Sequence, residues 1–292
     1  MKKSQSSRYF SLLIGAALVV CLYLWSSVYR NVSANPVSGE GQISALDVGQ
    51  ADATLINLSN GVQILVDCGR DAGASGAIAE RMPAADRKIE YVVLSHPDAD
   101  HIGGLESVLA SYEIGELIET KFEGETELGA RLEKKVKERG VKERVVKKSD
   151  RVDFTEGAKG LVLWPDEGEA ASMSTNDRSL VMRLDYKGGR LMLTGDAEVK
   201  AQNGILADFS AEELSSEILK VAHHGSSGAL NKKFLEEVRP AYAVISVGKN
   251  NSYGHPAQAV LSALQALGAE VLRTDEKGTI DFVYQGGWAV KK

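Results

Sequence analysis

The sequence predicts an α/β domain built from layered sheets, and two observations support this class. Beyond residue 41, short apolar runs of strand length alternate with stretches that have helical periodicity. Several neighbouring apolar runs are joined by glycine turns typical of β-hairpins, such as residues 59–61 (SNG) and 187–189 (KGG). Hairpins argue against a doubly wound parallel sheet, in which crossover helices connect the strands.

The individual elements follow from the same patterns. The apolar runs predict strands over residues 42–48, 53–57, 62–67, 91–95, 161–164, 180–186, 190–194, 218–222, 241–246, 270–273 and 279–284. Amphipathic periodicity predicts helices over residues 76–81, 105–112, 125–139, 231–238 and 256–267. The last two helices are followed closely by a proline and a glycine, which commonly mark the end of a helix.

Composition and charge limit the class of protein. The 292 residues are 43% hydrophobic and 25% charged, which excludes a disordered chain, and the two cysteines, Cys21 and Cys68, exclude a disulfide scaffold. The net charge is −6, but the first 30 residues carry four basic side chains and no acid, so the rest of the chain carries −10. This acidic body lacks the basic field of a typical duplex-binding protein.

The N-terminal segment predicts a membrane anchor. Residues 10–28 contain no charged residue, are about as long as the ~20 apolar residues of a spanning helix, and follow Lys2, Lys3 and Arg8. We therefore expect a cytoplasmic tail over residues 1–9, a single-pass signal anchor over 10–28, a linker over 29–41 and an extracytoplasmic domain over 42–292. The alternative is a secreted protein whose signal peptide is cleaved after small residues near position 34.

One charged run interrupts the acidic body. Residues 131–151 hold ten basic side chains and four acidic ones. A solvated helix face followed by an edge strand explains such a run better than a binding surface does. If the substrate is a polyanion, this run is still the one local stretch of sequence that could attract it.

The chemistry is predicted at the five histidines, each of which lies in a loop next to a predicted element. The sharpest motif, residues 94–104 (LSHPDADHIGG), leaves a strand and enters a helix through two glycines. Its potential ligands are His96, Asp98, Asp100 and His101. So dense a group of imidazoles and carboxylates suits divalent cations, with the first two residues facing one metal and the last two a second.

This motif resembles the H-x-H-x-D-H signature of the metallo-β-lactamase superfamily, with Asp98 in place of the second histidine. The variant H-x-D-x-D-H-x-G-G resembles the hydrolase domain of competence DNA-uptake proteins of the ComEC/Rec2 type. Further resemblances to that group occur at residues 46–53 (LDVGQADA), 176–184 (NDRSLVMRL), 193–196 (LTGD), 221–226 (VAHHGS) and 252–256 (SYGHP). Their order and spacing make a chance match implausible.

The resemblance implies a four-layer αββα sandwich with the site in loops at one edge of the two sheets. It implies six metal ligands: His96, Asp98, Asp100, His101, Asp196 and His223. Asp67 would brace the metal-binding loop, and Asn176 stands near the place of a histidine that this subgroup lacks, which would weaken one metal site. Three residues would act in catalysis: Asp100 by holding the attacking hydroxide, His224 by supporting the ligands or the substrate, and His255 by stabilising the transition state or donating a proton to the leaving group.

The same resemblance implies hydrolysis with two divalent metal ions, which would activate a bridging water. The oxygen-rich ligand set makes Mn²⁺ competitive with Zn²⁺. The expected partner is DNA, another nucleic acid or another phosphodiester substrate, and no obligate protein partner is inferred. The alternatives are a hydrolase of a small ester, lactone or lactam, and a metal-binding accessory protein with impaired catalysis.

Overall fold

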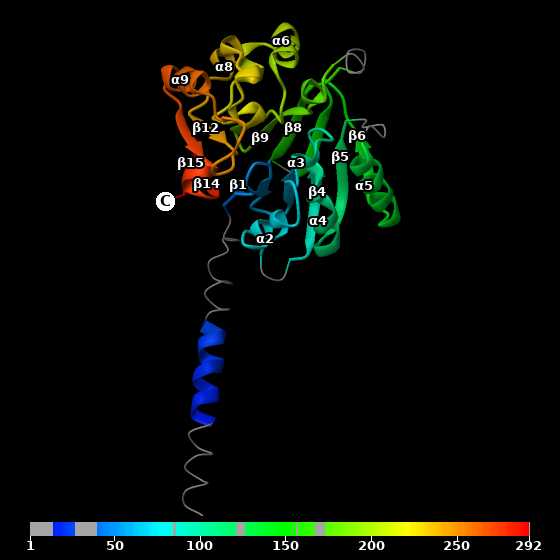
Figure 1. Cartoon of the computed structure of the whole chain (residues 1–292), viewed down its shortest axis with the longest axis vertical. Helices are drawn as coiled ribbons and strands as arrows, with labels where there is room; N and C mark the ends of the chain where they lie inside the picture. The colour runs from blue at the N-terminus through cyan, green and yellow to red at the C-terminus, as the bar shows by residue number, and fades with distance from the viewer. Residues whose placement is uncertain are drawn as a thin grey trace, which may run out of the picture.

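A computed structural model describes residues 14–26, 40–83, 86–120, 126–155, 157–166 and 173–291. The predicted tail over residues 1–9 and all of the predicted linker except residues 40 and 41 lie outside these ranges. Two sheets pack face to face, and helices cover the outer face of each (Figure 1). The predicted four-layer αββα sandwich is therefore confirmed.

The first sheet has eight strands in the order β15-β14-β1-β2-β3-β4-β5-β6. Their bounds are β1 Gln42–Ala45, β2 Thr54–Asn57, β3 Gln63–Val66, β4 Lys88–Val93, β5 Glu113–Glu119, β6 Lys142–Val145, β14 Ile280–Tyr284 and β15 Trp288–Val290. Pairs from β15 to β3 are antiparallel, and pairs from β3 to β6 are parallel. Hairpins thus build one half of the sheet and helical crossovers the other.

The second sheet repeats this plan with seven strands in the order β13-β12-β11-β10-β9-β8-β7. Their bounds are β7 Arg151–Thr155, β8 Ala158–Trp164, β9 Val181–Tyr186, β10 Gly189–Leu193, β11 Ile218–Lys220, β12 Tyr242–Ile245 and β13 Glu270–Arg273. Pairs from β7 to β10 are antiparallel, and pairs from β10 to β13 are parallel.

Two helical layers enclose the sheets. The helices are α2 Gly73–Ala79, α3 Ala99–Ile102, α4 Leu105–Ser111, α5 Glu127–Glu138, α6 Val199–Asp208, α7 Ala211–Leu214, α8 Lys232–Val238, α9 Gln258–Ala266 and α10 Thr274–Lys277, with short 3-10 turns η2 Asn176–Arg178, η3 Ala222–Gly225 and η4 Ser227–Ala229. The domain has three hydrophobic cores, and strand β3 contributes to two of them. Ile64 and Val66 face the second sheet, whereas Leu65 packs under the helices α2 to α5. Trp164 and Phe234 belong to the third core, under α6 to α9.

Some elements differ from the sequence prediction. Strand β5 was not predicted, because its three glutamates obscure the apolar alternation and it begins directly after α4 without a turn residue. Helix α6 was not predicted either. It contains Gly204, where a Cβ would lie 2.4 Å from the Trp164 ring, so close packing rather than helix propensity selects that glycine. Tertiary contacts that the sequence does not display therefore decide these elements.

The basic run over residues 131–151 forms helix α5, strand β6 at the edge of the first sheet, and the start of β7. Among the described residues, at least seven of its basic side chains lie within ion-pair distance of carboxylates. These side chains are Arg131, Lys134, Lys135, Lys137, Lys142, Arg144 and Lys148. Glu116 alone receives both Lys142 and Arg144. The run is thus a solvated helix and edge strand whose charge is largely offset locally.

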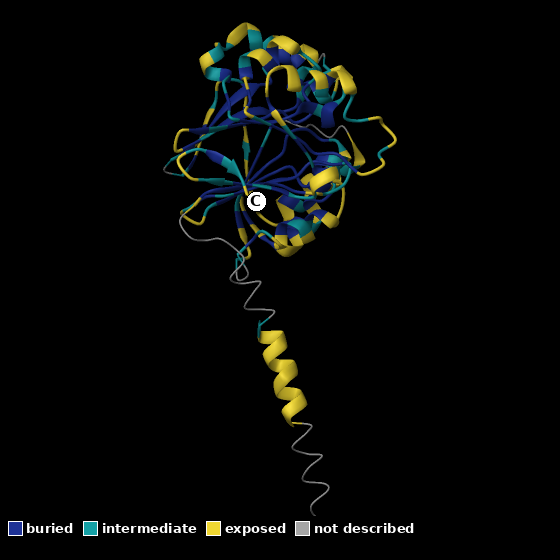
Figure 2. Ribbon diagram, turned by 90° about the vertical axis from the view of Figure 1, so that its left-hand side faces the viewer, coloured by how far each residue is buried: buried dark blue, intermediate teal, exposed yellow. Residues whose placement is uncertain are grey.

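The predicted membrane anchor requires correction. The helix in this segment covers residues 14–26, and within the described ranges no helix is long and apolar enough to cross a bilayer. Residues 14–26 are almost all exposed (Figure 2). The single-pass anchor over residues 10–28 is therefore wrong as a prediction, and the extracytoplasmic placement inferred from it no longer follows.

Candidate metal centre

The candidate site lies in loops where strands of both sheets end at one edge. The parallel strands β3 and β4 of the first sheet, and β10, β11 and β12 of the second, end there. Strands β2 and β9 run antiparallel to β3 and β10, so the residues just before them reach the same edge. The site therefore draws on seven segments that are distant in the sequence.

Asp67 organises the first histidine loop. Its Oδ1 accepts a hydrogen bond from the Ser95 backbone N–H at 2.8 Å, and its Oδ2 accepts from Ser95 Oγ and from His101 Nδ1, each at 2.8 Å. Because the Ser95 hydroxyl donates to Asp67, His96 Nδ1–H donates to Ser95 Oγ at 3.0 Å. Both imidazoles are thus held through Nδ1, which leaves Nε2 as the coordinating atom.

The two glycines of the motif permit a close backbone approach. A Cβ at Gly103 would lie 2.0 Å from the Arg70 carbonyl oxygen, and one at Gly104 would lie 2.0 Å from that of Cys68. The loop after β3 therefore packs directly against the two glycines that join α3 to α4. Side chains at either position would push Asp67 away from its histidine.

Four buried residues bring potential ligand atoms within 4.8 Å of one another: Asp52, His101, Asp196 and His224. His101 Nε2 faces Asp196 Oδ1 at 3.2 Å. Asp100 adds a fifth group, because its Oδ2 lies 3.4 Å from His224 Nε2. The backbone of Asp196 is fixed by a hydrogen bond, since its N–H donates to Ser179 Oγ at 3.0 Å.

The structure places His224, rather than the expected His223, in this cluster. Strand β11 ends at Lys220, and both histidines adopt left-handed backbone conformations with φ of 48° and 53°, so the second one turns inward. His224 is buried and its Nδ1–H donates to the Ser246 carbonyl at 2.8 Å, which directs Nε2 into the cluster. His223 is partly exposed, and its Nδ1–H donates to Glu198 Oε1 at 3.1 Å.

The remaining predicted groups lie beside the cluster. His96 is fully buried with its ring 4.1 Å from that of His101, and among the described residues its Nε2 has no hydrogen-bond partner. Asp98 Oδ2 lies 3.6 Å from this nitrogen, on a side chain that is 40% exposed. Asn176 is further away from this pair: its Nδ2 lies 3.3 Å from His223 Nδ1 and 3.5 Å from Glu198 Oε1.

Lys220 is a functional candidate that the sequence prediction missed. It is buried, forms an ion pair with the Asp52 carboxylate, donates to the Gly195 carbonyl at 3.0 Å and lies 3.8 Å from Asp196 Oδ1. Burial lowers the pKa of Lys220, but the charges of Asp52 and Asp196 outweigh it and raise the pKa overall. A lysine inside an otherwise apolar predicted strand was the available signal.

The carboxylates of the cluster are ionised at neutral pH. Burial raises the pKa of Asp100, but the hydrogen bond from His224 and the charge of His101 lower it to about 2. Burial likewise opposes ionisation of Asp196, and the charge and hydrogen bond of His101 hold the pKa well below its usual range. A buried site that keeps its carboxylates charged is suited to a cation.

His255 lies just before helix α9 and does not cap it. Helix α9 begins at Gln258 with Ala257 as its N-cap residue. The His255 backbone N–H donates instead to Asn251 Oδ1 at 3.1 Å, and the imidazole lies 5.5 Å from the His223 ring and 6.5 Å from the His224 ring. Burial, together with the charges of His223 and His224, lowers its pKa. His255 therefore faces the cluster as a neutral imidazole.

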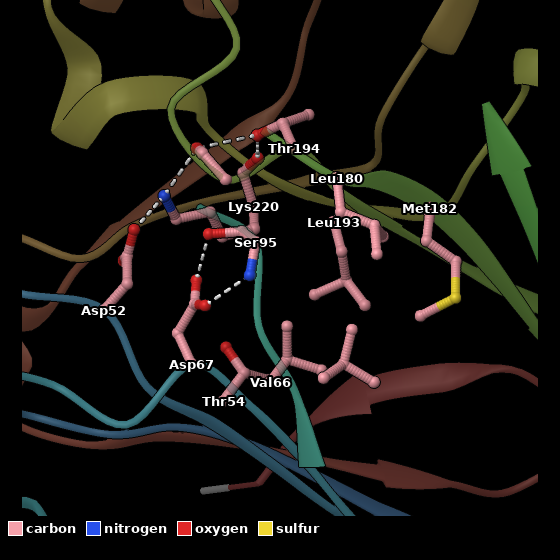
Figure 3. Close-up of a pocket in the computed structure, with 12 residues that line it drawn as sticks. Asp52, Thr54, Val66, Asp67, Ser95, Leu180, Met182, Leu193, Thr194 and Lys220 are labelled. Carbon is pink, nitrogen blue, oxygen red and sulfur yellow. Dashed lines mark hydrogen bonds and ion pairs between the residues drawn. The ribbon is translucent and has the colours of Figure 1, made fainter. Parts of the chain in front are cut away.

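A small cavity of about 10 Å³ lies beneath the cluster, between the sheets (Figure 3). Asp52, Asp67, Ser95 and Lys220 form its polar side, and Leu180, Met182 and Leu193 line its apolar side. Its volume is about that of a single water site, so it cannot hold a substrate. Substrate must therefore approach from the loop side.

The residues present fit a divalent cation. Three buried imidazoles have Nδ1 committed to the protein, the Nε2 of His96 is without a hydrogen-bond partner among the described residues, and ionised carboxylates stand opposite. Oxygen and imidazole nitrogen donors of this kind bind Zn²⁺ or Mn²⁺. The αββα sandwich and the site at the edge of its sheets place this chain among the metal-dependent hydrolases.

Comparison with known proteins agrees with this class. The sequence profile described as the Metallo-beta-lactamase superfamily matches residues 46–249, and the chain belongs to that superfamily. The chain is similar to ComE operon protein 3 of Bacillus subtilis (strain 168), with 30% identity over 266 residues, and to Competence protein ComA of Neisseria gonorrhoeae, with 31% identity over 244 residues. These matches cover 85% and 83% of this chain but only 34% and 32% of those proteins.

A solved structure supports the fold. The metallo-beta-lactamase fold protein YhfI from Bacillus subtilis superposes with a TM-score of 0.54 at 14% identity, covering 84% of this chain and 99% of that one. At this identity the likeness concerns the arrangement of the sheets and helices alone.

Proposed function

We propose that the protein is a phosphodiesterase that cleaves DNA or another nucleic acid. The observation that carries the proposal is the group formed by buried His101, Asp196 and His224 with partly buried Asp100, positioned by hydrogen bonds. Similarity to competence proteins supports the choice of nucleic acid. Because the chain spans about a third of those relatives, the activity is proposed for this domain only.

Two sets of residues would hold divalent metal ions. The first set is Asp100, His101, Asp196 and His224. The second is His96 and Asp98, with Asp196 shared between the sets, and it is the weaker one because Asn176 contributes no imidazole. Bound divalent cations supply a Lewis acid for the phosphate and lower the pKa of water.

Asp100 and His255 would have separate roles in catalysis. Asp100, which is ionised, orients the attacking water by accepting its hydrogen bond. His255 stands at the mouth, and its Nδ1 has no hydrogen-bond partner among the described residues. A neutral imidazole there would donate a hydrogen bond to the phosphate or the leaving group as negative charge develops.

The test compares substrate classes on the full-length chain. Protein loaded separately with Mn²⁺ and Zn²⁺ is assayed on bis-p-nitrophenyl phosphate, on single-stranded DNA, on nitrocefin and on a panel of lactones. We expect cleavage of the phosphodiesters, lost in His224→Ala. Hydrolysis of a lactone or lactam with no phosphodiester cleavage would favour a small-molecule hydrolase, and inactivity on every class with metal bound would favour an accessory role.

A further inference from the structure

Tyr253 presents an open aromatic face at the edge of the site. Its side chain is exposed at 64%, in the loop between β12 and α9. Its ring lies 5.9 Å from that of His255 at an interplanar angle of 29°, so one face is stacked on the histidine. The other face is left to solvent, and no core contact explains a tyrosine at this position.

The stack continues inward to the cluster. The His255 ring lies 6.5 Å from that of His224 at an interplanar angle of 26°. Tyr253, His255 and His224 thus form a row of roughly parallel rings that leads from the surface to a proposed metal ligand. A planar group on the outer face of Tyr253 would extend this row away from the site.

The loop that carries Tyr253 is held in place. Asn251 Nδ2 donates to the carbonyls of Gly248, at 3.2 Å, and His255, at 2.7 Å, and its Oδ1 accepts the His255 N–H. The Gly248 N–H in turn donates to Gln50 Oε1 at 3.0 Å, which ties the loop to the segment between β1 and β2. A ring placed in advance loses little conformational entropy when it stacks on a ligand.

Charge alone does not explain how this domain would hold a nucleic acid. The body is acidic, and the carboxylates around the basic run offset most of its charge. Arg70 is a cation near the site, 48% exposed with its guanidinium 3.5 Å from Asp100 Oδ2, and Lys249 is exposed in the Tyr253 loop. Contacts other than phosphate pairing would therefore add to the affinity.

We propose that the outer face of Tyr253 stacks on a nucleobase of the strand that is being cleaved, outside the nucleotide at the cleaved bond, and that this contact selects single-stranded substrate. The inference rests on the proposed phosphodiesterase function. Aromatic side chains bind bases in this way with little regard to sequence, because every base has a π-face. Bases in a duplex are already stacked on one another, so a single strand offers the free face that the tyrosine needs.

The experiment measures KM and kcat of the full-length, metal-loaded chain on a single-stranded oligonucleotide, on the same strand with abasic sites, and on the duplex. Tyr253→Ala should raise KM on the single strand about 5- to 100-fold with little change in kcat, whereas Tyr253→Phe should keep the wild-type KM. The matched control is Tyr23→Ala, because Tyr23 is 68% exposed but lies in the N-terminal helix. Melting temperatures of all variants should match the wild type, since both rings are exposed.

Two failures are distinguishable. If the wild type cleaves the single strand but Tyr253→Ala leaves KM unchanged, the stacking contact is overturned while the phosphodiesterase function stands. The same conclusion follows if Tyr253→Ala raises KM on the abasic strand as much as on the intact strand. If the wild type cleaves no nucleic acid, the proposed function is overturned and the stacking contact with it. Equal KM for single strand and duplex in the wild type would overturn the selection of single strands.

Discussion

Lys220 and Asp52 form a buried ion pair that joins strand β11 of the second sheet to the loop between β1 and β2 of the first. Both side chains are almost inaccessible to solvent. The Asp52 backbone N–H also donates to the Asp100 carbonyl at 3.1 Å, so the pair supports the loop that bears the proposed ligands. Because Asp52 already has a cation supplied by the chain, it is the member of the four-residue cluster least available to a metal.

The first prediction concerns the stability of this pair. Lys220→Met leaves the Asp52 charge buried without its partner, and we expect the free energy of unfolding to fall by about 3–5 kcal/mol. Urea denaturation with a chelator present measures the loss. Adding Asp52→Asn to Lys220→Met should recover much of it, since the unpaired charge is removed. Lys137→Met, which breaks an exposed pair with Glu133, is the control and should change little. A loss in the control as large as that in Lys220→Met would contradict the assignment.

The second prediction separates the two adjacent histidines. His224→Ala should lose the tighter metal site, because His224 Nε2 faces Asp100 inside the cluster. His223→Ala should retain that site, since His223 is partly exposed, its Nδ1 is bonded to Glu198, and its Nε2 approaches only Asp196, at 3.8 Å. Titration calorimetry with Mn²⁺ and Zn²⁺ on the full-length chain gives the stoichiometry and affinity. The reverse order of losses would show that His223 is the ligand.

The sequence predicts the site better in its residue types than in its geometry. His96, Asp98, Asp100 and His101 could be grouped because they are neighbours in one loop. The choice between His223 and His224 depends on two left-handed backbone conformations, which no side-chain pattern reveals. Lys220 was missed for a related reason: its partner Asp52 lies 168 positions away, and only the packing of the two sheets joins them.

The same distinction applies to the fold. Strands such as β9 and β12 were predicted because apolar residues dominate them, and the hairpins because glycines mark their turns. Strand β5 carries glutamates on a half-buried surface, where Glu116 is acceptable because Lys142 and Arg144 of β6 neutralise it. Long-range pairing of this kind is decided by tertiary structure rather than local propensity.

The third prediction concerns the brace beneath the metal ligands. Asp67→Ala removes the acceptor for His101 Nδ1 and for the Ser95 hydroxyl, which in turn positions His96. We expect metal affinity to fall about 10- to 100-fold without loss of the coordinating atoms. Ser95→Ala should have a smaller effect, because the bond between Asp67 and His101 remains. Competition with a chromophoric chelator measures both, and equal affinity in Asp67→Ala and the wild type would rule out the brace.

The fourth prediction is a pH dependence of stability that arises from Glu119, the last residue of β5. Glu119 is partly buried, and burial together with the charges of Glu143 and Glu133 raises its pKa to about 7. The unfolded chain releases this proton near the ordinary glutamate value of 4.5. Between these values the native state therefore holds a proton that the unfolded state has lost, so this group makes stability fall as pH rises from 4.5 to 7.

Glu119→Gln removes this penalty. The variant should gain up to about 3 kcal/mol relative to the wild type at pH 8, and nothing at pH 4, where the carboxyl is protonated in both states. Glu113→Gln, an exposed position on the same strand, is the matched control and should follow the wild type at both values. Urea denaturation of the three proteins at pH 4, 6 and 8 measures the difference, and comparing variants at each pH cancels the titration of the metal centre. A gain at pH 4 as large as at pH 8 would mean that side-chain packing, and not the buried charge, is what the substitution changes.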